Sequence, residues 1–388
     1  MKKAFTLIEL VVSVGILALM LSFASVIFKV SIESHRIAGA NAEIMRKFRA
    51  ITDQLNSDFK GLRKDADIFV AWYGDYDEEL GKYMRFDRIF FFANGDFHTY
   101  DPAPLIPIGS GEKFVRGNLA WICYSPARRP DGTRAWQFTS PNPDQRELER
   151  RSRILARAQH VFTADPDVAF TSYVARGPGL GMSSRYTATS WHTWGQLYEH
   201  EKLSLAEWKN IDVADANDKA DIFTAATDVP ITGNPVLEWY SGAIIDPADP
   251  NDIHKLLCEG VGQFMVQGWS DAQQRWIPEI DLDGDGHAAT GGPTDFVINP
   301  ATGDLDEGAF IRVWYPYRSE NSLWSGIRIG DGTGQYDGRP VLQTLVNEER
   351  FNEIPGLGRA LKFTFTLYDS KGIIKDGRTL SHIVYLDN

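Results

Sequence analysis

The first hydrophobic feature of the chain is an apolar run at residues 5–28 that holds one charge, Glu9, and no proline. A helix rises about 1.5 Å per residue, so a run of this length can cross the hydrocarbon core of a bilayer, about 30 Å thick. Lys2 and Lys3 precede the run, and no basic residue follows until Lys29. The positive-inside bias therefore predicts a single pass with a cytoplasmic N-terminus and the rest of the chain across the membrane.

The periodicity changes at residues 29–62, where apolar side chains recur three, four and seven positions apart between charged ones. They are Ile37, Ile44, Phe48, Ile51, Leu55, Phe59 and Leu62. This spacing predicts that the membrane helix continues as an amphipathic helix, whose apolar stripe packs on a globular domain. Gly61 or the polar run at 63–65 is expected to end it.

Beyond residue 62 the pattern changes to short apolar or alternating runs separated by turn-rich segments, which is typical of antiparallel β-structure. Strands are predicted at 68–72, 88–92, 119–124, 243–245, 263–269, 309–315, 360–368 and 382–386. We interpret residues 126–240 as a large elaboration of one domain, with helices at 145–159 and 204–208. The predicted fold class is α+β, with a long N-terminal helix packed on an antiparallel β-rich domain of residues 63–388.

Charge and composition narrow the classes of function. The net charge of −12 repels nucleic acid, so no nucleic-acid partner is expected. The sequence holds no Ser-His-Asp, zinc-ligand or phosphate-loop pattern, which predicts a structural protein and no enzymatic activity.

Two cysteines, Cys123 and Cys258, lie far apart in apolar, strand-like contexts. They could form a disulfide if the domain lies outside the cytoplasm. Equally, buried free thiols are common in such contexts. The sequence leaves both alternatives open.

One acidic segment matches the opening of a calcium-binding loop. Asp281, Asp283 and Asp285 alternate with glycines that turn the chain, so their carboxylates can converge on a hard cation. The twelfth loop position is Gly292, where an EF-hand has a bidentate glutamate, so a site here would be looser and could borrow Asp295. The alternative interpretation is an acidic turn between strands.

The segment Ala4-Phe5-Thr6-Leu7-Ile8-Glu9-Leu10 departs from an ordinary secretory signal. In such a signal the small cleavage-site residue follows the apolar core, whereas Ala4 precedes it. A carboxylate inside an apolar span costs several kcal/mol unless it is paired, so Glu9 indicates a function.

These residues resemble the prepilin signature of the type IV pilin superfamily. The resemblance implies that a prepilin peptidase removes residues 1–4, cutting between Ala4 and Phe5, and that Phe5 is then N-methylated. Ala4 stands where most members have glycine. In a staggered helix bundle, Glu9 would neutralise the new amine of a neighbouring subunit and fix the register of assembly. The transmembrane part of the helix would then be residues 5–28.

Further segments resemble minor pseudopilin J of the type II secretion system; they lie at 51–59, 256–266, 271–276 and 354–364. That resemblance implies a structural subunit at the tip of a periplasmic pseudopilus that primes assembly and supports protein export across the outer membrane. Its partners would be other minor and major pseudopilins and an inner-membrane assembly platform. The rival interpretation is a minor type IV pilin whose insertion at 126–240 binds an external ligand. The sequence leaves open whether the subunit belongs to a type II secretion system, a type IV pilus or a transformation apparatus.

Overall fold

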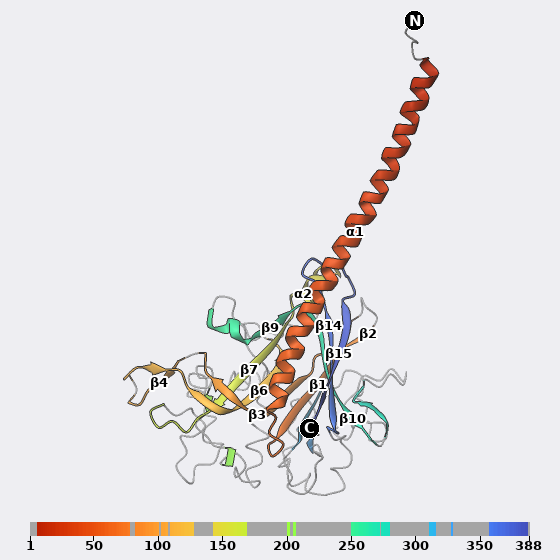
Figure 1. Cartoon of the computed structure of the whole chain (residues 1–388). Coiled ribbons are helices and arrows are strands. Elements are labelled where there is room, and N and C mark those ends of the chain that lie inside the picture. Colours follow the sequence, from red (N-terminus) through yellow and green to blue (C-terminus); the bar gives the residue numbers. More distant parts are fainter. Residues whose placement is uncertain are drawn as a thin grey trace.

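One long helix and a set of antiparallel sheets make up the computed structural model of the chain (Figure 1). The structure describes residues 6–77, 82–100, 102–107, 109–127, 143–168, 200–201, 205–206, 250–271, 273–279, 310–315, 327–328 and 357–386. Helix α1 spans Leu7–Lys60 and its first half extends away from the globular part. This architecture confirms the predicted α+β class.

Helix α1 ends where the chain must approach a neighbouring strand closely. Gly61 caps the helix, its N–H donating to the carbonyl of Asp58 at 3.1 Å. The N–H of Asn94 donates to the carbonyl of Gly61 at 2.7 Å. A Cβ on residue 61 would lie 2.1 Å from the Asn94 carbonyl oxygen, so only glycine fits at this turn.

The larger sheet has nine described strands, in the order β13-β12-β1-β3-β6-β7-β8, with β2 paired to β1 and β9 paired to β7. Its pairs are antiparallel except β7 with β8. The strands are β1 Ile68–Asp77, β2 Lys82–Arg85, β3 Arg88–His98, β6 Arg116–Pro126, β7 Ile154–Phe162, β8 His200–Glu201, β9 Leu256–Glu259, β12 Phe310–Tyr315 and β13 Ile327–Arg328.

A second sheet of four strands follows the order β11-β10-β14-β15. These strands are β10 Val261–Ser270, β11 Arg275–Ile277, β14 Ala360–Leu367 and β15 Arg378–Tyr385. The remaining described elements are β4 Ala103–Pro104, β5 Glu112–Lys113, the helix α2 Pro143–Ser152 and the 3-10 helix η4 Pro250–Lys255.

The core lies between α1 and both sheets. Phe59 of the helix stacks on Phe91 of β3, with ring centroids 4.2 Å apart, and meets Phe363 of β14 at 5.4 Å. Leu55 and Ile51, one turn and two turns earlier on the same face, are completely buried. The apolar stripe of the helix therefore joins the two sheets into one core.

A buried ion pair also links the two sheets. The guanidinium of Arg85 donates to the carboxylate of Asp87 and to the carbonyl of Pro278, the latter at 2.7 Å. Asp87 in turn accepts the N–H of Val266 in β10 at 2.7 Å. The several hydrogen bonds compensate much of the cost of burying both charges.

The structure corrects one predicted element. The run at 145–159 was expected to be helical throughout, but α2 stops at Ser152 and the chain continues as β7, Ile154–Phe162. This strand pairs with both β6 and β9, so part of the segment interpreted as an insertion lies inside the larger sheet. The predicted strand at 243–245 and most of the predicted helix at 204–208 lie outside the described residues.

Candidate assembly helix and its attachment to the globular domain

Glu9 lies in the first turn of α1, where it forms a capping box with Thr6. The backbone N–H and the hydroxyl of Thr6 each donate to Oε2 of Glu9 at 2.9 Å, and the N–H of Glu9 donates to the Thr6 hydroxyl oxygen at 3.4 Å. This arrangement satisfies N–H groups that have no partner within the helix and fixes the direction of the Glu9 side chain. Ala4 and Phe5, the residues of the expected cleavage site, lie outside the described residues.

Thr6 is a residue that the sequence reasoning did not single out. The local signal was present, because a threonine three positions before a glutamate and ahead of an apolar run is the pattern of a capping box. The exposed carboxylate of Glu9 has two oxygens, and Oε2 accepts both bonds from Thr6. Oε1 has no hydrogen bond within the described part of the chain.

The first half of α1 presents an apolar surface with no cover from its own domain. No side chain from residue 6 to residue 39 is buried, and Ala40 is the first that is. The helix is long and apolar enough to cross a membrane. Because water penalises such an exposed apolar surface, this half of the helix needs lipid or other helices around it.

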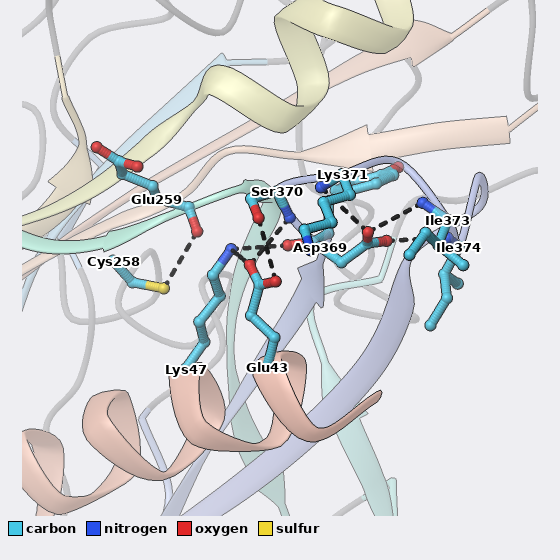
Figure 2. A network of polar contacts seen from close by, with 10 residues as sticks. Glu43, Lys47, Cys258, Glu259, Asp369, Ser370, Lys371, Ile373 and Ile374 are labelled. Carbon is cyan, nitrogen blue, oxygen red and sulfur yellow. Dashed lines mark hydrogen bonds and ion pairs between the residues drawn. The ribbon is translucent and has the colours of Figure 1, made fainter. Parts of the chain in front are cut away.

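The helix enters the globular part through a polar attachment, which we call the collar. It joins Glu43 and Lys47, one turn apart on α1, to the segment that follows β14 (Figure 2). Lys47 pairs with Glu43 at 3.0 Å and donates to the carbonyl of Tyr368 at 2.9 Å. Glu43 accepts the N–H of Ser370 at 2.9 Å and its hydroxyl at 3.1 Å. The charged ends of Glu43 and Lys47 are therefore matched by each other and by polar groups across the junction.

The collar changes the electrostatics of its acidic groups. Burial would raise the pKa of Glu43, but the hydrogen bonds from Lys47 and Ser370 and the positive charge of Lys47 outweigh it and hold that pKa below 4.5. Asp369 behaves in the same way. Burial opposes its charged form, yet the N–H groups of Lys371, Ile373 and Ile374 donate to its carboxylate and lower its pKa below 3.8.

Asp369 supplies a pH-dependent contribution to stability. Because its folded pKa lies below the unfolded value, the stabilisation is complete above about pH 4 and is lost as the pH falls through the folded pKa. We expect Asp369→Asn to lower the free energy of unfolding by about 1–3 kcal/mol at pH 7, because the loop N–H groups lose a charged acceptor. Denaturant unfolding should show that the difference between parent and variant shrinks as the pH falls below about 4. A difference that stays constant down to pH 2 would contradict this role.

The two cysteines are buried as free thiols, so the possible disulfide is not formed. Cys123 of β6 lies opposite Ala158 of β7, whereas Cys258 of β9 lies opposite Leu155 of the same strand. The two cysteines therefore lie two strands apart and are offset by three residues along the strand direction, so their Cα atoms are about 14 Å apart at ordinary sheet spacings. A disulfide needs Cα atoms within about 7 Å. Burial raises the pKa of the Cys258 thiol to about 11 and that of Cys123 to about 12, which keeps both unreactive.

A buried ion pair fixes the end of α1 to the larger sheet. Arg157 of β7 donates from Nε and Nη2 to the two carboxylate oxygens of Asp58, at 2.6 and 2.8 Å. The hydroxyl of Tyr124 in β6 donates to the same carboxylate, and Gln54 donates to it at 3.1 Å. Burial, together with the negative charge of Asp58, raises the pKa of Tyr124 well above 10, so the phenol keeps its proton and remains a donor.

The collar and the Asp58 ion pair lie about eleven to fifteen residues apart on α1, or about 16–23 Å along its axis. The first fixes the helix where it leaves the domain, and the second fixes it near its C-terminal end. Two fixed points determine the rotation and the axial position of a rod. Together they set the direction in which the apolar half of α1 projects.

The predicted calcium ligands Asp281, Asp283, Asp285 and Asp295 lie outside the described residues. Within the described ranges, no group of three or more His, Cys, Asp or Glu side chains is placed to hold a metal ion. The calcium interpretation therefore stays a prediction.

The comparison with protein families agrees with the geometry of the N-terminal helix. A family model described as the prokaryotic N-terminal methylation motif matches residues 1–25. No curated protein and no solved structure matches the chain. The matched motif and the long apolar helix support a membrane-anchored subunit of the type IV pilin-like class. The motif implies processing by a prepilin peptidase and assembly with other pilin subunits.

Proposed function

We propose that this chain is a minor pseudopilin, most similar to type J, that acts as a structural tip and priming subunit of a type II secretion pseudopilus. In this role it supports the export of folded proteins across the outer membrane and catalyses no reaction. Its N-terminus lies in the cytoplasm, α1 crosses the inner membrane, and the β-rich domain lies in the periplasm. The partners are other minor and major pseudopilins and the inner-membrane assembly platform.

The observation that carries the proposal is the combination of a methylation motif with an uncovered apolar helix that its own domain holds at two points. The motif occupies residues 1–25, and the helix has no buried side chain before Ala40. A soluble globular protein would bury such a helix, whereas a filament subunit needs it free for the membrane and then for neighbouring helices. The order of the segments that resemble type J supports the finer assignment.

A secretion assay tests the assignment to a type II machine. Deleting the gene should leave exported enzymes trapped in the periplasm of the host, and the full-length chain supplied in trans should restore their export. Normal export in the deletion strain would contradict the proposal. A simultaneous loss of surface pili would favour a pilus machine instead.

The alternative is a minor type IV pilin at a pilus tip, whose segment at 126–240 binds an external ligand. The size of the segment at 126–240 supports this alternative, because type J pseudopilins usually have a much shorter segment at this place. Deleting residues 169–199, which leaves β6, β7 and β9 intact, should then spare assembly but abolish ligand capture. In the pseudopilin role the same deletion should leave no adhesive defect.

Calcium binding at Asp281, Asp283 and Asp285, with help from Asp295, is a proposal of its own. A cation that binds the folded chain alone stabilises it by mass action. The melting temperature of the full-length chain in detergent should rise by about 2–4 °C at calcium near ten times the dissociation constant. The rise should vanish in an Asp283→Ala, Asp285→Ala double variant. If calorimetry shows no shift at millimolar calcium, the segment is an acidic turn.

A further inference from the structure

The outward side of the second half of α1 is positively charged, although the chain as a whole is acidic. Residues 61–388 hold 32 of the 40 Lys and Arg residues but 47 of the 52 Asp and Glu residues. On the helix between residues 40 and 60, by contrast, Arg46, Arg49 and Lys60 are exposed. We call these three side chains the basic strip.

The acidic side chains of the same segment offset the charge of the strip only in part. Glu43 is held in the collar by Lys47 and Ser370, and Asp58 is buried against Arg157. Asp53, the one exposed acidic side chain between residues 40 and 60, lies in the same sector of the helix as the strip. It offsets one of the three positive charges and leaves the strip with a net charge of +2.

Within the described part of the chain, none of the three basic side chains of the strip takes part in a hydrogen bond or an ion pair. The strip therefore offers its charge to another molecule.

The strip lies on the side of the helix that its own domain leaves open. At about 100° per residue, Arg46, Arg49 and Lys60 fall within one 60° sector, nearly opposite the buried side chains of Ile44, Ile51 and Leu55. Three small side chains are exposed among the basic ones, namely Ala42, Ala50 and Ser57. Small side chains let another surface approach the helix closely, so that long basic side chains on either side can reach its polar groups.

We propose that the basic strip docks on a carboxylate-rich face of the globular part of a neighbouring pilin-like subunit, an inference that rests on the proposed function. In a filament, the inner face of this helix segment is occupied by its own domain, so the outward face is the one that meets the next subunit. The globular part of this chain shows that such a subunit can carry a large excess of carboxylates. Complementary charge selects the partner and sets the register of contact.

An anionic lipid surface fits the strip less well. Lys29 directly follows the apolar run, and Arg46 lies seventeen residues beyond Lys29. This separation is about 26 Å along the helix axis. The headgroup region extends only about 5–8 Å beyond the hydrocarbon core. With Lys29 near the membrane surface and α1 straight, the strip stands clear of the headgroups and faces protein.

Site-specific photo-crosslinking in the native host tests the proposal. A photoreactive phenylalanine derivative at Ala50 of the full-length chain should form an adduct with the globular part of a pilin-like subunit, in a peptide rich in Asp and Glu. Arg46→Glu together with Arg49→Glu should lower the adduct yield about tenfold, because attraction becomes repulsion. Arg116→Glu together with Arg378→Glu makes the same change of charge at exposed strand positions and should leave the yield unchanged.

Two results would overturn the inference. One is an adduct with lipid or solely with an apolar helix, and the other is a yield that the Arg46, Arg49 reversal does not alter. Failure of the proposed function is distinguishable, because the parent chain would then be missing from isolated filaments. A parent chain that is present in filaments but insensitive to the reversal refutes the docking surface alone.

Discussion

Replacing Glu9 with leucine should leave the chain in the membrane but reduce its incorporation into filaments at least tenfold. Insertion should be as good as that of the parent, because the change removes a charge from an apolar span. Assembly should suffer because the free amine that cleavage creates on a neighbouring subunit loses its ionic partner in an apolar environment. Quantitative immunoblotting of membrane and sheared-filament fractions measures both effects.

Glu9→Gln is the matched control for this experiment, because glutamine also closes a capping box with Thr6. If the charge is what matters, the glutamine variant should assemble as poorly as the leucine variant. If capping is what matters, the glutamine variant should assemble normally. Unchanged incorporation of both variants would refute the pairing role in this chain. It would not contradict the assignment to the pilin-like class, because a subunit at the extreme tip has no neighbour above it with which to pair.

Replacing Asp58 with alanine should lower the free energy of unfolding by about 3–5 kcal/mol, because it leaves the largely buried guanidinium of Arg157 without its ionic partner. The Tyr124 hydroxyl also loses its acceptor. Denaturant unfolding monitored by tryptophan fluorescence measures the change. Asp53→Ala, on the same helix but exposed, should alter stability by less than about 0.5 kcal/mol.

A second variant separates stability from the direction of the helix. Arg157→Met together with Asp58→Leu replaces the ion pair with apolar groups of similar size, which often preserves or raises stability. If the pair also fixes the orientation of α1, the double variant should fold but assemble less well than the parent. Loss of less than 1 kcal/mol in Asp58→Ala would show that the ion pair is not what holds the end of the helix.

The sequence predicted α1 well because the signals that define a helix are local. The apolar stripe at Ile44, Ile51 and Leu55 follows the 3.6-residue period over several turns, and the end at Gly61 carries its own chemical signal. Alternation similarly identified β10 and β14, which pair with each other in the second sheet.

Contacts between distant segments could not be predicted in this way. β7 has many residues that favour helices, and only pairing with β6 and β9 makes it a strand. Asp58 and Arg157 are separated by 99 positions, and Glu43 and Ser370 by 327, so nothing in the local pattern marks them as partners. The polar groups that fix the helix therefore emerged from the structure alone, whereas the assembly role of Glu9, which the sequence suggested, stays a prediction.

Mass spectrometry of the mature N-terminus tests the central claim most directly. If the chain is a pilin-like subunit, protein isolated from native membranes should begin at Phe5, carry one methyl group on its amine and lack residues 1–4. A chain that retains Met1, or that begins at any residue other than Phe5, would contradict the account.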